Sequence, residues 1–163
     1  MPAQPPRALL TLVSGGQTGV DRAALDVAME RGLTCGGWCP AGRTAEDGPI
    51  DARYPLRETP SADPAERTEW NVRDSDATLL LITRARSPGT ELTHDVARRL
   101  GRPVYLWPLD ARPDPDAFRR WLQVHNIRTL NVAGPRESES PGVYASARDC
   151  LRAALPDRSA SAG

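Results

Sequence analysis

Short apolar runs alternate with amphipathic segments along most of the chain. Five runs bounded by turn-forming residues are expected to be strands: residues 8–13, 33–38, 77–83, 104–107 and 129–133. Five further segments carry the apolar spacing or the capping signals of helices: residues 18–31, 63–74, 91–100, 114–125 and 140–155. The alternation predicts an α/β fold with a doubly wound, mostly parallel sheet of about five strands and helices on both faces.

The helix expected from residue 63 has the clearest start signal. Asp63 suits the N-cap, Pro64 the first helical position, and Glu66 stands three residues after the cap, as in a capping box. The preceding residues 39–62 are rich in proline, glycine and charge. So long a segment without regular structure is usually functional or mobile.

A chain of 163 residues is long enough for one domain with a sizeable core. We expect residues 8–155 to form a single ligand-binding domain. Residues 1–7 are predicted to be a flexible, proline-rich arm, and residues 156–163 a disordered tail.

Composition narrows the possible partners. The 21 basic residues are all arginine and are balanced by 21 acidic residues, which argues against bulk binding to nucleic acid or to a membrane surface. No signal peptide or long apolar run is visible, so a cytoplasmic protein is expected. Cys35, Cys39 and Cys150 lack the spacing of a zinc site or a disulfide framework, and no metal ligated by the protein is predicted.

A glycine-rich turn follows the first expected strand. The turn and the helix start after it contain Ser14, Gly15, Gly16, Gln17, Thr18, Gly19, Asp21 and Arg22. Glycines let a ligand approach the backbone, and the free N–H groups at a helix start favour an anion such as phosphate. Because the chain has no lysine, backbone, hydroxyls and arginine would have to hold it. The alternative is a tight turn without a ligand.

Two more loops with glycine and hydroxyl groups follow later strands. One contains Gly89, Thr90 and Glu91, and the other contains Gly134, Arg136, Glu137 and Ser138. Carboxyl ends of parallel strands share one sheet edge, and the first two loops would open side by side if the first and third strands were neighbours. Three such loops favour a polyanionic or nucleotide-like ligand. Arg67, early in its helix, would reach that ligand, and Trp38 could stack on a flat heterocycle or cover the core.

Several motifs together identify a family resemblance. They are Ser14–Arg22, Gly36–Pro40, Ala45–Gly48 and Thr68–Ala77, and the likeness covers about residues 9–153. The chain resembles the "putative molybdenum carrier" family, whose better-studied members bind and protect molybdenum cofactor. The resemblance implies a Rossmann-like fold and a homo-oligomer, a dimer or tetramer, which holds the phosphorylated pterin (molybdopterin) for delivery to molybdoenzymes.

A more distant likeness is to the cytokinin-activating phosphoribohydrolases, often mislabelled lysine decarboxylases. Arg67 precedes Ser75-Asp76 by their interval, but Thr93 occupies the position of their catalytic glutamate. Glu91 is near, yet its place on the helix turns it elsewhere. Because N-glycosidic hydrolysis needs a positioned carboxylate, this departure favours binding over turnover, and no catalytic residue is assigned.

The leading hypothesis is therefore a carrier that binds the cofactor phosphate at one or more glycine loops, with Arg67 or Arg136 adding charge. The metal would be carried by the dithiolene of the cofactor itself. One alternative is a nucleotide-processing enzyme that hydrolyses nucleoside monophosphates with Asp21, Glu91 or Glu137. Another is a nucleotide-sensing module that works with a partner protein.

Overall fold

A five-stranded parallel sheet forms the centre of the computed structural model, which describes residues 9–158. Its strands, in the spatial order β2-β1-β9-β7-β8, are β2 (Thr34–Gly36), β1 (Thr11–Val13), β9 (Thr129–Ala133), β7 (Ala77–Ile82) and β8 (Val104–Pro108). Every pairing among them is parallel. The expected α/β, doubly wound sheet is confirmed. The expected arm at residues 1–7 lies outside the described residues, as do residues 159–163 of the expected tail.

The first and third strands are not neighbours, because the last strand lies between them. In register, Val13 of β1 pairs with Asn131 of β9, and Leu80 of β7 pairs with Ala133 on its other side. The condition under which the first two glycine loops would open side by side, that β1 and β7 are neighbours, is therefore not met. Residues 130–133 of β9 are all buried, as a strand with a neighbour on each side requires. Counted from β9, the order becomes the 3-2-1-4-5 arrangement of Rossmann-type sheets, with the chain starting at the second strand.

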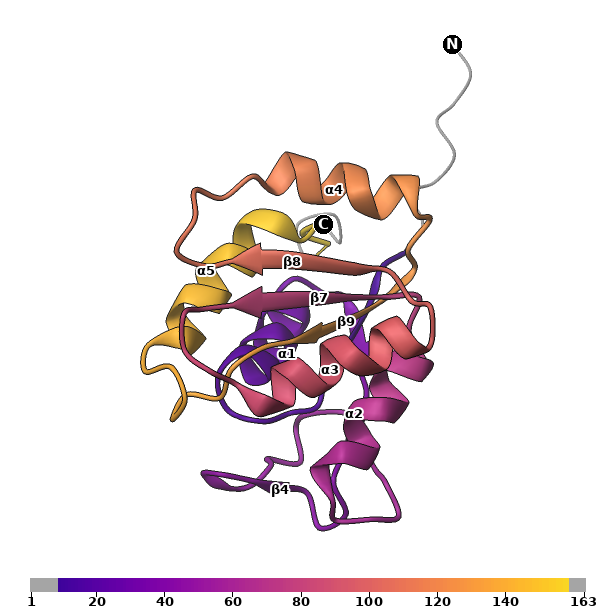
Figure 1. The fold of residues 1–163 in the computed structure, drawn as a ribbon, viewed down its shortest axis with the longest axis vertical. Helices are drawn as coiled ribbons and strands as arrows, with labels where there is room; N and C mark the ends of the chain where they lie inside the picture. The colour runs from indigo at the N-terminus through magenta and orange to yellow at the C-terminus, as the bar shows by residue number, and fades with distance from the viewer. Residues whose placement is uncertain (1–8, 159–163) are drawn as a thin grey trace.

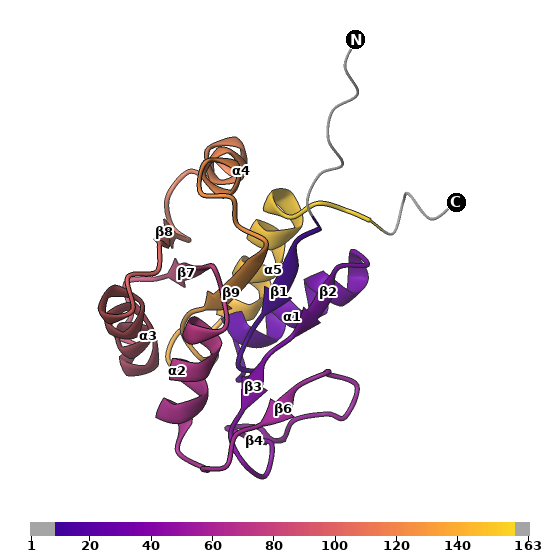
Figure 2. The ribbon, with the colours of Figure 1, turned by 90° about the vertical axis from the view of Figure 1, so that its right-hand side faces the viewer.

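Helices cover both faces of the sheet (Figures 1 and 2). On one face α1 (Val20–Glu30) packs against α5 (Val143–Ala154), and α4 (Pro115–Val124) lies beside α5. On the other face α2 (Pro64–Arg73) packs against α3 (Pro88–Arg99). Within residues 9–158, none of these helices has the length and apolar character needed to cross a membrane.

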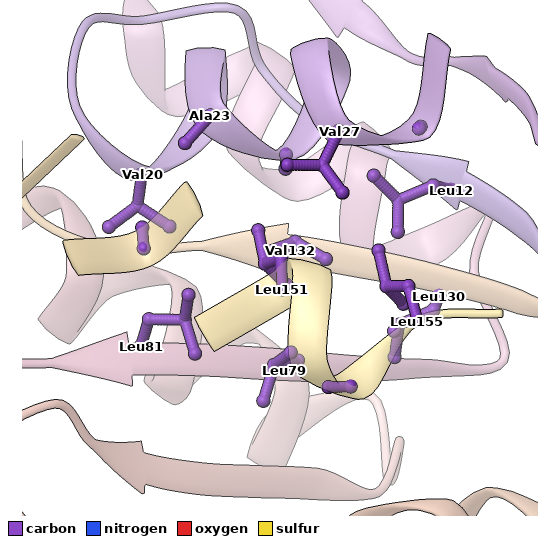
Figure 3. Close-up of a cluster of buried hydrophobic side chains, with 14 of the residues drawn as sticks. Leu12, Val20, Ala23, Val27, Leu79, Leu81, Leu130, Val132, Leu151 and Leu155 are labelled. Carbon is purple, nitrogen blue, oxygen red and sulfur yellow. The ribbon is translucent and has the colours of Figure 1, made fainter. Parts of the chain in front are cut away.

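The larger apolar core lies between the sheet and the α1–α5 face (Figure 3). Leu79 and Leu81 of β7 and Leu130 and Val132 of β9 contribute to it from alternate strand positions, and all four are fully buried. Facing them are side chains of α1 and α5 such as Val20, Val27, Leu151 and Leu155. This layer fixes α1 and α5 on the sheet, and with them the loops that precede both helices.

Two helices have the expected N-cap residue, and two others start at different residues from those predicted. The side chains of Asp63 and Asp114 accept hydrogen bonds from first-turn amides, as expected. Glu66 departs from the capping box, because its carboxylate accepts from the amide of Ser61. Helix α3 starts at Pro88, three residues before the predicted start, which places Gly89, Thr90 and Glu91 in its first turn. Helix α5 starts at Val143 rather than residue 140, after Gly142 at a φ of 88°.

Residues 39–62 contain more regular structure than expected. Strand β3 (Trp38–Cys39) pairs with β6 (Arg57–Glu58), and β4 (Thr44–Ala45) forms an antiparallel hairpin with β5 (Gly48–Pro49). The guanidinium of Arg43 donates to four backbone carbonyls of the segment, those of Ile50, Asp51, Tyr54 and Leu56. Ile50, Tyr54 and Leu56 also form an apolar cluster with Leu25 and Cys39, which anchors the segment on α1.

The described end of the chain contacts the end of α1. The amide of Arg158 donates to the Arg31 carbonyl at 2.8 Å, and the Arg31 guanidinium lies 3.6 Å from the Asp157 carboxylate. These two residues belong to the tail for which disorder was expected.

Candidate functional site

A cavity of about 290 Å³ opens at the carboxyl edge of the sheet, next to the ends of β9 and β7. We call it the switch-point cavity. All three glycine loops contribute to it, because β9 brings its own loop between those of β1 and β7. Helix α2 supplies the remaining wall. The lining residues are Gln17, Asp21, Pro64, Arg67, Ser87, Pro88, Gly89, Thr90, Thr93, Ala133, Gly134, Arg136 and Glu139.

Glycines permit the close approach of these loops. A Cβ on Gly134 would lie 2.4 Å from the Leu81 carbonyl oxygen, and one on Gly19 would lie 2.4 Å from the Pro135 carbonyl oxygen. Gly19 also has a φ of 79°, a conformation that other residues rarely adopt. At Gly15 a Cβ would meet the Arg67 guanidinium at 2.1 Å, so glycine there lets the arginine lie across the turn.

The turn before α1 uses much of its hydrogen-bonding capacity within the protein. The amides of Gln17, Thr18 and Arg22 donate to acceptors within residues 17–21, and that of Val20 donates to the Pro135 carbonyl at 3.2 Å. The Ser14 hydroxyl, fully buried, donates to the Asp21 carbonyl.

The first turn of α3 also contains amides without an acceptor. Among the described residues, no acceptor takes the amide of Gly89 or Thr90, and a Cβ on Gly89 would meet nothing within 4 Å. The Thr90 and Ser87 hydroxyl oxygens lie 2.7 Å apart, and Ser87 donates to Glu139. Gly89 and Thr90 both line the cavity, so these two amides lie at its wall.

Arg67 and Asp21 form the charged centre of the cavity. An Arg67 guanidinium nitrogen donates to the Asp21 carboxylate at 3.4 Å, and both side chains are largely buried. Burial raises the pKa of the Asp21 carboxyl, against the lowering effects of Arg67 and of the Gln17 amide. The Nε of Arg67 is buried without a hydrogen-bond partner among the described residues. The second arginine, Arg136, is already paired with Glu139 and Glu46.

The two positions compared with the phosphoribohydrolases lie on different sides of α3. The Glu91 side chain is 58% exposed, pairs with Arg86 at 3.7 Å and does not line the cavity. Thr93, two residues further along α3 and so on the other side of the helix, is buried in the cavity wall and donates to the Gly89 carbonyl at 2.8 Å. A hydroxyl, not a carboxylate, therefore faces the cavity from this turn of α3.

Several predicted residues line a second, more open hollow of about 830 Å³, here called the outer groove. It lies among α1, the start of α5 and the segment 39–62. Glu137 lines it but also accepts from the amides of Gly142 and Tyr144 at the start of α5. The lining residues are Thr18, Gly19, Arg22, Asp26, Glu46, Asp47, Arg53, Tyr54, Glu137, Ser138 and Tyr144.

No motif in the sequence predicted the residues at the centre of the outer groove. The hydroxyls of Tyr54 and Tyr144 both donate to the Asp26 carboxylate, at 2.6 and 2.5 Å. These three residues are far apart in the chain and belong to no recognisable motif. Burial, more than the hydrogen bond to Asp26, raises the pKa of Tyr54 to about 12.

Trp38 and Gly16 lie outside both cavities. The Trp38 indole N–H donates to Asp74 at 2.9 Å, and the ring contacts Trp70 edge to face at 4.7 Å. The Arg57 guanidinium lies 4.3 Å from its ring centre, so the expected stacking position for a ligand is occupied by protein. Gly16 faces the Leu56 side chain beneath the segment 39–62. Within residues 9–158, no three His, Cys, Asp or Glu side chains are grouped as metal ligands.

The strand order and the cavity at the carboxyl edge of the sheet indicate the class of protein to which the chain belongs. Residues 12–155 match the model of the Circularly permutated YpsA SLOG family, and the chain belongs to that family. The family description agrees with a sheet whose central strand is contributed by the end of the chain.

A solved structure gives a closer comparison. The chain is similar to a Syntrophus aciditrophicus SB protein named "putative molybdenum carrier protein", with a TM-score of 0.86 and 40% identity. The match covers 91% of this chain and 96% of that one, so both belong to one family. A search of curated protein sequences gave no match.

Proposed function

We propose that this protein is a carrier that binds molybdenum cofactor through its phosphorylated pterin in the switch-point cavity. The observation that carries the proposal is that three glycine loops and Arg67, whose Nε is buried without a hydrogen-bond partner among the described residues, line one cavity at the crossover of the sheet. The name of the solved relative supports molybdenum-related cargo. The cavity lining offers no cluster of metal ligands, which suits a cargo whose metal is bound by its own dithiolene.

In this proposal the first turn of α3 and Arg67 bind the phosphate. The amides of Gly89 and Thr90 are free to donate, and the positive end of the helix dipole favours an anion there. Arg67 reaches the same cavity from α2 and adds a full positive charge. A volume of about 290 Å³ is at the lower end for ligand pockets, so part of the cofactor would extend beyond the cavity.

Cofactor retention tests the proposal. Molybdenum cofactor released from a molybdoenzyme is incubated with the protein, and the fraction that is retained and protected from oxidation is measured. We expect micromolar binding that Arg67→Met weakens by about tenfold to a hundredfold, the scale of one or two charge-assisted hydrogen bonds. Arg84→Met is the matched control, because the Arg84 side chain is 93% exposed and pairs with Asp110.

The proposal fails if the wild-type protein neither retains nor protects the cofactor. The assignment of the phosphate fails if the two arginine variants retain it equally. Light scattering on the same samples tests the homo-oligomer, a dimer or tetramer, that we also propose from the family resemblance. Transfer to a cofactor-free molybdoenzyme tests whether bound cofactor can be delivered.

One observation favours a second candidate, a hydrolase that acts on nucleoside monophosphates. Asp21 is a buried carboxylate in the cavity wall whose pKa is raised by burial, as in many general acids. Release of free base from nucleoside monophosphates, abolished by Asp21→Asn, would favour this candidate over the carrier. Glu91 and Glu137 are poorer candidates, because neither lines the switch-point cavity.

A further inference from the structure

The carboxylate of Glu46 is held by an unusual number of donors. The hydroxyl of Ser138 donates to it at 2.5 Å, the amide of Ser138 at 3.1 Å and the guanidinium of Arg136 at 3.2 Å. The Thr18 hydroxyl donates to Oε1 of Glu46, the oxygen that also accepts from the Ser138 amide. We call the three donor residues, Thr18, Arg136 and Ser138, the anion cradle. Their bonds lower the pKa of Glu46, those from Ser138 and Thr18 most, and so favour its ionised form.

The anion cradle and the carboxylate that it holds lie on different parts of the fold. Thr18 and Ser138 lie in the loops before α1 and α5, which are fixed to the sheet by the packing of those helices. Glu46 is instead at the tip of the β4–β5 hairpin, in the two-residue turn before Gly48. The tip has few other attachments to these loops: the Glu46 amide donates to Gln17, and Asp47 pairs with Arg22. A preformed donor set therefore holds a carboxylate carried on a separate hairpin.

The cradle also lies between the two cavities. Arg136 lines the switch-point cavity, whereas Thr18, Ser138 and Glu46 line the outer groove. Removal of the Glu46 carboxylate would leave hydroxyl, amide and guanidinium donors without their acceptor, between residues that line the two hollows. Hydroxyls, a backbone amide and an arginine are the donors expected for an oxyanion, and a carboxylate is the protein group that most resembles one.

We infer that the anion cradle is a second anion-binding subsite, filled by Glu46 in the free protein and by a tetrahedral oxyanion when that anion displaces Glu46. Displacement frees the tip of the hairpin and joins the switch-point cavity to the outer groove. A ligand larger than the first cavity then has room across the start of α1. The inference does not depend on the identity of the cargo, because it concerns any ligand with an anionic group.

Anion titration of full-length variants tests the inference. Inorganic phosphate and molybdate are the probes, and calorimetry measures their dissociation constants for the wild type and for Glu46→Ala. Without its internal competitor the cradle should bind either anion about tenfold more tightly or better. Adding Ser138→Ala to Glu46→Ala should abolish this gain. A preference for molybdate over phosphate would identify free oxyanion, rather than a phosphate ester, as the natural occupant.

Asp47→Asn is the matched control, because it removes a negative charge from the same hairpin tip and leaves the cradle occupied. Equal gains in anion affinity in Glu46→Ala and Asp47→Asn would overturn the inference. A looser hairpin tip or the loss of one negative charge would then explain both results. Unchanged affinity in Glu46→Ala would also overturn it. In the wild type, saturating phosphate should also speed hydrogen exchange of the Glu46 amide, and no change there would contradict displacement. Cofactor retention is measured separately, so a carrier that fails that test leaves this result intact.

Discussion

The pairing of Arg67 with Asp21 in the switch-point cavity shows how burial and a neighbouring charge act together on one carboxylate. Asp21 is 4% exposed, and the cost of burying its charge outweighs the attraction of the guanidinium 3.4 Å away. Its pKa therefore lies above its ordinary value of 3.8 in the folded protein. The Nε of Arg67 has no hydrogen-bond partner among the described residues, so Asp21 satisfies only part of the guanidinium group.

This raised pKa predicts a pH dependence of stability. The folded state binds the Asp21 proton more tightly than the unfolded state does, so its contribution is fully present below the unfolded pKa. That contribution is lost as the pH rises through the folded pKa. Asp21→Asn has no such proton to lose, and its free energy of unfolding should rise relative to wild type between acid and neutral pH. Urea denaturation of both proteins across this range measures the difference, and parallel curves would contradict it.

Gly134 is the residue for which we expect the largest effect of one added methyl group. A Cβ there would meet the Leu81 carbonyl oxygen at 2.4 Å and the Val20 side chain at 2.6 Å, and neither can move freely in the core. Gly134→Ala should lower the free energy of unfolding by about 1–3 kcal/mol. Gly89→Ala is the control, since nothing lies within 4 Å and alanine favours the helix by up to about 1 kcal/mol. Chemical denaturation distinguishes the two outcomes.

At the scale of elements, β9 is the one whose position could not be predicted. Its apolar run indicated a strand, but a run of five residues does not specify its neighbours. Helix starts were more predictable, because Asp63 and Asp114 cap their helices through local bonds to nearby amides. The glycine loops were expected at one edge and are there, because parallel strands end on the same side. The partners of those loops were missed: Glu46 reaches Ser138 across 92 residues of sequence.

A central β9 predicts that its core side chains contribute strongly to stability. Leu130 is fully buried between the sheet and α1, so Leu130→Ala should cost about 2–5 kcal/mol through lost burial and the cavity that it leaves. Leu106 of the edge strand β8 is 50% exposed, and Leu106→Ala should cost far less. Thermal or urea unfolding of both variants measures the contrast. Similar losses of stability in the two variants would contradict the prediction that the central strand β9 contributes more to stability than the edge strand β8.

At the scale of the whole molecule, residues 9–158 form an α/β fold that begins at the second strand of a Rossmann-type order. Its β9–α5 unit corresponds to the first strand and helix of that order. Figure 2 shows that both ends of the described chain lie on the same side, away from the loops of the ligand edge. The three loops are thus assembled from the two ends and the middle of the sequence.

This arrangement predicts that a circularly permuted chain will fold. Joining residue 163 to residue 1 connects the two described ends through the 13 residues 1–8 and 159–163, which span up to about 43 Å, and new ends fit between His125 and Asn126, both exposed. The product should unfold cooperatively and bind the same ligands as the natural chain. Circular dichroism during thermal unfolding, together with anion titration, tests both properties. A product without cooperative unfolding would show that chain order, and not only strand order, is required.

The central place of β9 also has a consequence for biosynthesis. Until residues 129–133 have been made, β1–β2 and β7–β8 are two separate half-sheets, each with an unpaired inner edge. The loop with Gly134 and Arg136 is made later still, so a nascent chain has no complete switch-point cavity. The switch-point cavity is complete only in the finished protein, and a chain truncated before β9 offers two open sheet edges to aggregation.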